Sequence, residues 1–197
     1  MRGASLLGRR RSAIAIAAVL SSVAGCAFGG QSTGSADLGP LVSSADATTI
    51  IGMDPPHQGR YPSLGTIVLR NQSRTAPVVL HGVGLTDTDH LKVEAAYVLP
   101  IGPNDSTFGG GFFVPPDHAG FPDAHQNRAW KGRAQLDGYE LAPQAQVNLL
   151  VVVDTDDPCG GNSTGVEVRY ESGGAAHVVT SPTGIEMHDD QYPACAR

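Results

Sequence analysis

The sequence predicts an all-β fold, a single antiparallel β-sandwich of about seven to nine strands with one long aromatic-rich loop. Short runs rich in β-branched residues recur along the chain, turn-forming clusters separate them, and no long amphipathic helical pattern competes with them. Strand runs at this spacing, without alternating helices, favour an antiparallel sandwich over a parallel α/β sheet. A closed barrel remains an alternative, because the sequence does not show which strands pair.

Seven runs have this strand pattern, and all lie between residues 65 and 181. They occupy residues 65–71, 77–85, 91–99, 108–114, 146–153, 165–171 and 175–181. Clusters such as Asn71-Gln72-Ser73 and Ser172-Gly173-Gly174 lie between them, and these residue types are typical of turns. The runs fit one domain at 48–197, whose roughly 150 residues suffice for a single core.

The first 25 residues have the three-part pattern of a secretory signal. Arg2 and the run Arg9-Arg10-Arg11 come first, an apolar stretch runs from Ala13 to Val23, and small residues follow. The apolar stretch is too short to cross a bilayer as a helix. The sequence therefore predicts a signal peptide at 1–25.

The stretch Val23-Ala24-Gly25-Cys26 resembles the lipobox of bacterial lipoproteins. That resemblance implies removal of the signal before Cys26 and attachment of a diacylglycerol, with fatty acids such as palmitate, to its thiol. Two acyl chains hold a protein stably at a membrane, since each buried methylene contributes about 0.8 kcal/mol. We expect a lipid anchor on the extracytoplasmic face of the cell membrane. The alternative is an ordinary cleavage site followed by an incidental cysteine.

The segment from the lipidated cysteine to Ala47 is predicted to be a flexible tether at 26–47. It consists largely of Gly, Ser, Ala and Thr and has almost no large apolar side chain. Such a composition does not bury enough surface to offset the entropy lost on ordering.

Charge argues against nucleic acid as a partner. The whole chain has 13 basic and 19 acidic residues, and the signal peptide contains four of the arginines and no acid. Nine basic residues then remain against 19 acidic ones, which gives the mature chain a formal charge of −10. A surface of that charge does not suit nucleic acid or anionic lipid.

Two further cysteines, Cys159 and Cys195, are expected to form a disulfide. The predicted compartment is oxidising, and loop entropy for a closed loop of this length is worth about 4 kcal/mol. Metal ligation by the two thiols is the alternative. A CxxC redox motif does not occur in the sequence.

Two longer stretches resemble a family of small, largely uncharacterised actinobacterial lipoproteins. They read "IVLRNQSRTAPVVLHGVGL" and "YELAPQAQVNLLVVVDTDDPCGG", and the resemblance covers about residues 60–185. It implies an immunoglobulin-like β-sandwich behind a lipobox and a polar tether. It implies no catalytic residues.

The long irregular region from Pro100 to Arg133 concentrates the aromatic residues. Connections of this length are uncommon in compact domains and are often functional, and aromatic side chains are favoured at contact surfaces. The sequence therefore predicts a surface for an unidentified envelope protein or ligand, with the alternative that the aromatics cover one open end of the sandwich. The residues concerned are Phe108, Phe112, Phe113, Phe121 and Trp130.

The same region contains a candidate metal site. Imidazole and carboxylate groups together suit zinc or copper, although the spacing matches no known ligand scaffold. The alternative is a set of solvated polar residues in a surface loop. The four residues are Asp117, His118, Asp123 and His125.

Other metal and enzyme motifs are weak. The acidic run at 154–157 lacks the glycine and distant glutamate of a helix-loop-helix calcium loop, and Met187-His188 lacks the soft ligands of a copper carrier. Gly-x-Ser-x-Gly matches at 30–34 and 161–165 lack the strand-turn-helix setting of a nucleophile elbow. We therefore expect no cofactor and a non-enzymatic binding or accessory module, with zinc or copper binding as the alternative function.

Overall fold

The computed structural model describes residues 39–45, 47–56, 61–102, 107–114, 124–188 and residue 195. All of them belong to one unit, Ser35–Arg197. The predicted signal peptide and Cys26 lie outside the described residues. Within the described part of the chain, no helix has both the length and the apolar character needed to cross a membrane.

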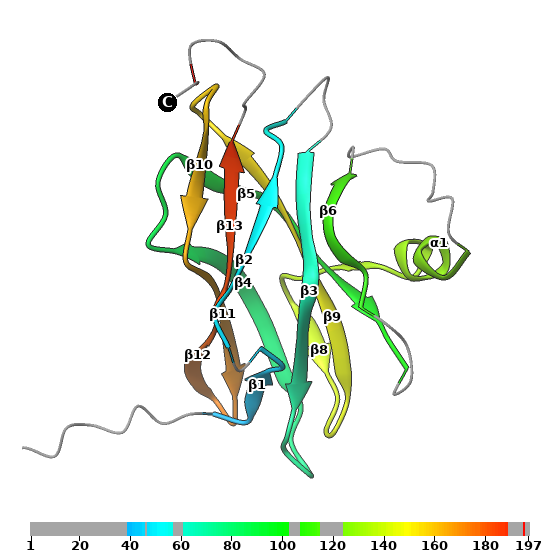
Figure 1. Ribbon diagram of the computed structural model, residues 1–197. Helices are drawn as coiled ribbons and strands as arrows, with labels where there is room; N and C mark the ends of the chain where they lie inside the picture. The colour runs from blue at the N-terminus through cyan, green and yellow to red at the C-terminus, as the bar shows by residue number, and fades with distance from the viewer. Residues whose placement is uncertain are drawn as a thin grey trace, which may run out of the picture. The chain divides into compact units, whose positions relative to one another are not determined.

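Thirteen strands and one helix make up the described residues (Figure 1). The elements are β1 (Leu41–Ser43), β2 (Thr49–Met53), β3 (Tyr61–Asn71), β4 (Val78–Thr86), β5 (Leu91–Pro100), β6 (Gly109–Val114), α1 (Ala124–Lys131), β7 (Ala134–Gln135), β8 (Tyr139–Leu141), β9 (Gln146–Thr155), β10 (Gly160–Ser163), β11 (Gly165–Ser172), β12 (Ala175–Ser181) and β13 (Thr183–His188).

The strands form three sheets. A six-stranded sheet has the order β1-β3-β9-β5-β7, with β6 also paired to β3, and a four-stranded sheet has the order β12-β11-β4-β8. The third sheet is β10-β13-β2, in which β2 runs parallel to β13 while the other pairings are antiparallel. The prediction of an all-β sandwich built from antiparallel sheets is confirmed, with more and shorter strands than the seven to nine expected.

One long hairpin links the two smaller sheets. Its turn lies between Ser172 and Ala175, where β11 and β12 begin to pair, and β10 and β13 extend the pairing as far as Gly160 and His188. The register shifts by one residue between the two halves, between the pairs Val166–Ser181 and Ser163–Ile185. The hairpin therefore spans the domain, with its turn at the bottom of Figure 1 and its open end at the top.

The main core lies between the six-stranded sheet and the other two sheets. Strand β9 reads QVNLLVVVDT, and seven consecutive residues from Val147 to Val153 are buried. Alternate side chains on this strand, including Leu149 and Val151, face the main core with Val166 and Val168 of β11. A continuous apolar run of this kind is typical of a strand that is covered on both faces.

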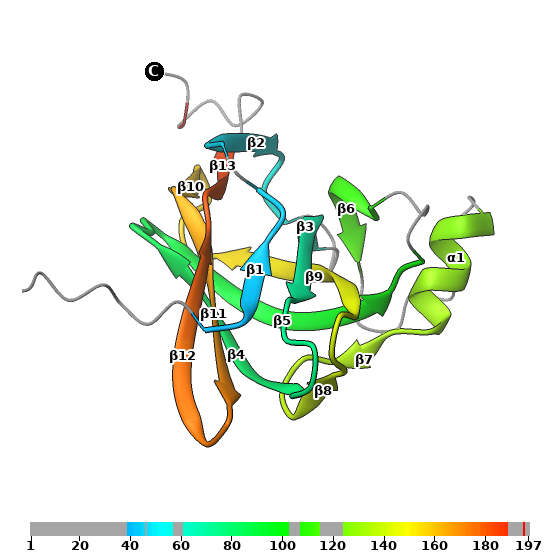
Figure 2. The ribbon, with the colours of Figure 1, turned by 90° about the horizontal axis from the view of Figure 1, so that it is seen from below.

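A second, smaller core covers the opposite face of the six-stranded sheet. Leu150 and Val152 of β9 pack there with Leu99, Phe108 and Trp130. Trp130 comes from α1, so the helix forms a third layer, and Figure 2 shows the six-stranded sheet between α1 and the four-stranded sheet. The region from Pro100 to Arg133, expected to be irregular around the predicted strand run at 108–114, therefore contains that strand, as β6, and also helix α1, which was not expected.

A buried asparagine attaches this region to the sheet. Asn148 of β9 is fully buried, and its amide nitrogen donates to the carbonyls of Gly65 and Ile67, where the pairing of β3 with β9 shifts. Its amide oxygen accepts from the backbone nitrogen of Phe108. These hydrogen bonds give partners to backbone groups at the point where the pairing of β3 with β9 shifts. The shifted pairing can therefore be buried.

The predicted boundary between tether and domain at residue 47 is wrong. Leu41–Ser43 form β1 and pair with the end of β3, and the Leu41 side chain is 3% exposed. The composition of the segment is dominated by small residues, yet its end adds a short strand at the edge of the six-stranded sheet.

Candidate functional site

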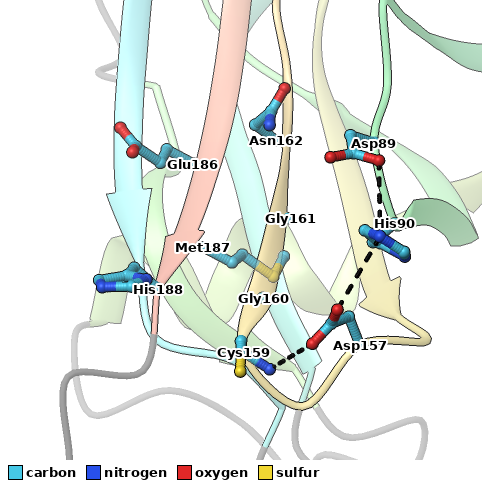
Figure 3. A pocket seen from close by; sticks show the side chains of 10 residues that line it. All are labelled: Asp89, His90, Asp157, Cys159, Gly160, Gly161, Asn162, Glu186, Met187 and His188. Atoms are coloured by element: carbon cyan, nitrogen blue, oxygen red, sulfur yellow. Dashed lines mark hydrogen bonds and ion pairs between the residues drawn. The ribbon is translucent and has the colours of Figure 1, made fainter. Parts of the chain in front are cut away.

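A hollow of about 420 Å³ opens at the open end of the long hairpin. It lies between β10, β13 and the connection from β4 to β5 (Figure 3). Charged and polar side chains, backbone and one disulfide cysteine form its walls. The lining residues are Asp89, His90, Asp157, Cys159, Gly160, Gly161, Asn162, Glu186, Met187 and His188.

The backbone of β10 contacts the β4–β5 connection on one side and β13 on the other. Asp89 and Asn162 exchange two backbone hydrogen bonds, of 2.9 and 3.0 Å, which tie the β4–β5 connection to β10. Gly160 has a φ of +106°, and a Cβ atom there would collide with the Met187 carbonyl. Glycine is therefore required at this position, because only glycine adopts that conformation without strain.

His90 is the centre of a cluster of three carboxylates. Its Nδ1 lies 2.9 Å from Asp156 Oδ1, and its Nε2 lies 3.6 Å from Asp89 Oδ1 and 3.8 Å from Asp157 Oδ2. Figure 3 shows the ring between the carboxylates of Asp89 and Asp157. The side chain of His90 is 49% exposed, so water screens these interactions.

The cluster changes the ionisation of the histidine. The hydrogen bond to Asp156, followed by the charge of Asp89, raises the pKa of His90 above its usual value. Both effects favour the imidazolium, since a positive ring is stabilised by adjacent carboxylates. Loss of solvation on burial opposes the rise in pKa, but its effect is smaller than either of these.

The predicted pairing of Cys159 with Cys195 is supported by the geometry. The two sulfur atoms are 2.04 Å apart and the Cα atoms 5.2 Å apart, which is disulfide distance. Asp157 Oδ1 accepts a 2.7 Å hydrogen bond from the Cys159 backbone nitrogen. The rim of the hollow next to His90 is therefore joined covalently to the end of the chain.

The opposite wall comes from β13. Along this strand Glu186 and His188 are exposed, whereas Met187 between them is 2% exposed and forms the floor of the hollow. The alternation follows from the period of two in a β-strand.

The arrangement brings negative charge into a concave, rigid surface. Four carboxylates, those of Asp89, Asp156, Asp157 and Glu186, lie in or beside the hollow, and only imidazoles balance them among the lining residues. A hollow with one predominant sign of charge attracts ions or groups of the opposite sign. Its chemistry suits a positively charged group.

The predicted metal site is mostly outside the described residues. Asp117, His118 and Asp123 fall there, and His125 lies in α1, away from the hollow. In the part of the chain that the structure describes, no group of three or more His, Cys, Asp and Glu residues could hold a metal ion.

The predicted aromatic contact surface needs a correction. Phe108 is 2% and Trp130 is 1% exposed, so both are core side chains and do not form a contact surface. The backbone of Phe112 and Phe113 pairs with β3, while their side chains, together with Phe121, lie outside the described part. Trp130 also packs edge-on against Tyr97 and lies under the Arg133 guanidinium.

Sequence reasoning missed the His90 cluster. It considered the acidic run at 154–157 only as a weak calcium motif and did not connect it with Asp89 or His90. The pairing of β5 with β9 sets Leu91 opposite Thr155, which brings the two segments together. The backbone of His90 is left-handed, with a φ of 58°, and no sequence pattern indicated this for a histidine.

No protein family and no curated protein matches the sequence. Among solved structures, the chain is similar to the ASH/PapD-like domain 7 of human CEP192, with a TM-score of 0.34 and 10% identity over 76% of this chain and 84% of that one. It is also similar to the VesB protease of Vibrio cholerae, with a TM-score of 0.31 and 10% identity over 76% of this chain and 32% of that one. At these scores the likenesses carry no argument about function.

Proposed function

We propose that the chain is a membrane-anchored extracytoplasmic lipoprotein that acts as a non-enzymatic binding module. Its anchor is the lipid on Cys26, and its contact surface is the hollow between His90 and His188. The partner is an envelope protein that inserts a positively charged segment, such as a lysine or arginine side chain, into the hollow.

The observation that carries the proposal is the acidic, rigid hollow. Asp89, Asp157 and Glu186 line it, and the disulfide at Cys159 together with the backbone bridge to Asn162 holds its walls. A preformed site loses little conformational entropy when it binds a partner. Complementary charge also speeds the encounter with a cationic segment.

The course of the chain is compatible with the anchor. Gly39, at the start of the described chain, lies against Tyr170 and His177, near the turn of the long hairpin. The hollow lies at the other end of the same hairpin. The described chain therefore begins at one end of the hairpin, and the proposed contact surface lies at the other.

The anchor is tested by metabolic labelling of the full chain with an alkyne analogue of palmitate in a bacterial host. We expect label and membrane fractionation for the natural chain, and loss of both for Cys26→Ser. Ser35→Ala in the same segment is the control and should retain both. A labelled Cys26→Ser chain would contradict the anchor.

The contact surface is tested by photo-cross-linking in living cells. A photoreactive amino acid replaces Glu186 in the hollow or, as a control, the exposed Glu140 on β8. We expect a discrete cross-linked product from position 186 and none from position 140. Equal products from both positions, or none from 186, would contradict the proposed surface.

A further inference from the structure

Strand β12 is an edge of the four-stranded sheet. It pairs antiparallel with β11 over seven residues, from Ala175 opposite Ser172 to Ser181 opposite Val166, without a register shift. In the described residues no strand pairs with its other side, and β12 forms the outer margin of the ribbon in Figure 2. One row of its backbone donors and acceptors therefore faces outward.

The strand has none of the features that usually protect a sheet edge. Natural edges are blocked by lysine, proline, bulges or very short strands. The sequence AAHVVTS has no acidic residue, lysine, arginine or proline, and the pairing is regular. Among the described edge strands, β1, β7, β8, β10 and β2 are shorter, and β6 has a register shift.

An exposed valine occupies the midpoint of this edge. Val178 is 50% exposed and lies opposite Arg169 on the outer face of the sheet. Among the described residues, Ile50 of β2 is the other exposed large apolar side chain. The Ile50 side chain lies over Gly184 of the neighbouring strand, which gives it a partner within its own sheet.

We propose that β12 pairs antiparallel with β12 of a second copy, with Val178 on the two-fold axis. The two four-stranded sheets then join into one continuous sheet. This interaction goes beyond the proposed binding function, because β12 and the hollow are separate surfaces.

The position of Val178 favours a second copy over an unrelated strand. When the whole strand pairs with itself, residue 178 faces residue 178 of the other copy, and Ala176 faces Thr180. The exposed valine is then buried against its own copy, on the face where cross-strand pairs interact. A centred self-pairing buries the midpoint valine of both copies against each other.

The charges of the sheet do not oppose this pairing. Arg169, Glu167 and Glu171 all lie on β11, one strand in from the edge. Equivalent charges on the two copies are then three strand spacings apart, about 14 Å, which exceeds the Debye length at physiological salt. Edge pairing is therefore not prevented by like charge.

A single strand pair buries less surface than a standard interface of about 1,600 Å², so the dimer is weak in solution. Anchoring of both copies to one membrane would raise their effective concentration. The full chain in its membrane is therefore the appropriate sample for the test.

The test uses single cysteines in the full chain, expressed in a bacterial host and resolved on non-reducing gels. In the proposed register, the Cβ atoms of residue 178 in two copies are about 5 Å apart, within reach of a disulfide. We expect Val178→Cys to form a covalent dimer. The natural chain, Ile50→Cys and Thr180→Cys alone should stay monomeric.

The register is tested by a double variant. Ala176→Cys with Thr180→Cys places a thiol on each side of the expected pair, so a dimer should form although Thr180→Cys alone forms none. A monomeric Val178→Cys chain overturns the proposal. A dimer of Ile50→Cys at the same level also overturns it, because cross-linking would then report chance collision.

A second measurement does not depend on cysteine chemistry. The membrane chain is extracted in mild detergent and its mass measured by sedimentation, with Val178→Lys compared with Ile50→Lys. We expect at least tenfold weaker dimerisation for Val178→Lys and none of this loss for Ile50→Lys. Equal behaviour of the two variants, with both folded by circular dichroism, overturns the proposal.

Discussion

The aromatic region and the acidic turns of this protein differ in burial: the aromatic side chains are in a core, whereas the acidic turns meet at the surface. Phe108 and Trp130, expected at the surface, are buried on the outer face of the six-stranded sheet. The acidic turns around Asp89 and Asp156, which the sequence did not connect, converge on His90. Aromatic residues in an irregular segment are thus a poor guide to a contact surface where a large sheet needs a cover.

The largest expected effect comes from the aromatic layer. Trp130→Ala should lower the free energy of unfolding by up to about 5 kcal/mol, because it leaves a cavity between α1 and the sheet. Arg128→Ala, an exposed change on the same helix, should stay within about 0.5 kcal/mol. Urea denaturation measures both, and similar midpoints would mean that Trp130 is not core.

The disulfide should have the next largest effect. Replacing both Cys159 and Cys195 by serine removes a covalent link across 36 residues, worth about 4 kcal/mol by loop entropy. Thermal unfolding of the natural chain with and without reductant gives an independent value. An unfolding temperature insensitive to reductant would contradict a stabilising bond at the rim of the hollow.

A smaller effect is expected at the buried asparagine. Asn148→Ala leaves the carbonyls of Gly65 and Ile67 and the nitrogen of Phe108 without their side-chain partner, at a cost of about 1–3 kcal/mol. Gln72→Ala, at an exposed position, is the control and should change little. Urea midpoints give the comparison, and an unchanged Asn148→Ala midpoint would show that the bonds contribute nothing net.

The smallest effect concerns the pH dependence of the acidic turns. Because the folded-state pKa of His90 is raised, its contribution to stability is complete below the unfolded value and is lost as pH rises through the folded pKa. The natural chain should therefore exceed His90→Asn in urea midpoint by more at about pH 5.5 than at about pH 8.5. Asparagine tolerates the left-handed backbone of this position.

Asp156→Asn provides the matched variant for that comparison. It removes the carboxylate that contributes most to the raised pKa of His90, so the pH dependence should diminish. The difference in urea midpoint between the natural chain and His90→Asn should vary with pH. If it does not, the carboxylates around His90 do not raise its pKa.

Strand patterns could be predicted from the sequence because burial on a sheet leaves a local signal. The run from Val147 to Val153 is apolar on both faces apart from Asn148, and it forms the central strand β9. The disulfide pair could also be predicted, because Cys159 and Cys195 were the two cysteines left after the lipobox.

The hollow could not be predicted, because it depends on long-range register. His90 and Asp156 are 66 residues apart and meet only through the pairing of β5 with β9. Helix α1 was missed because its eight residues, AHQNRAWK, have a single buried side chain and lack the repeated apolar pattern of a longer helix. Local patterns thus predicted strands, whereas converging turns and a covering helix required the fold.

The most direct test of the account reverses the charge of the hollow. The full chain with Asp157→Lys and Glu186→Lys is compared with Glu140→Lys in the native membrane, and proteins that co-purify with each are quantified after mild extraction. The account predicts that a partner recovered with the natural chain is lost from the double variant and retained by Glu140→Lys. Retention by the double variant, with its fold intact by circular dichroism, would contradict binding at the hollow.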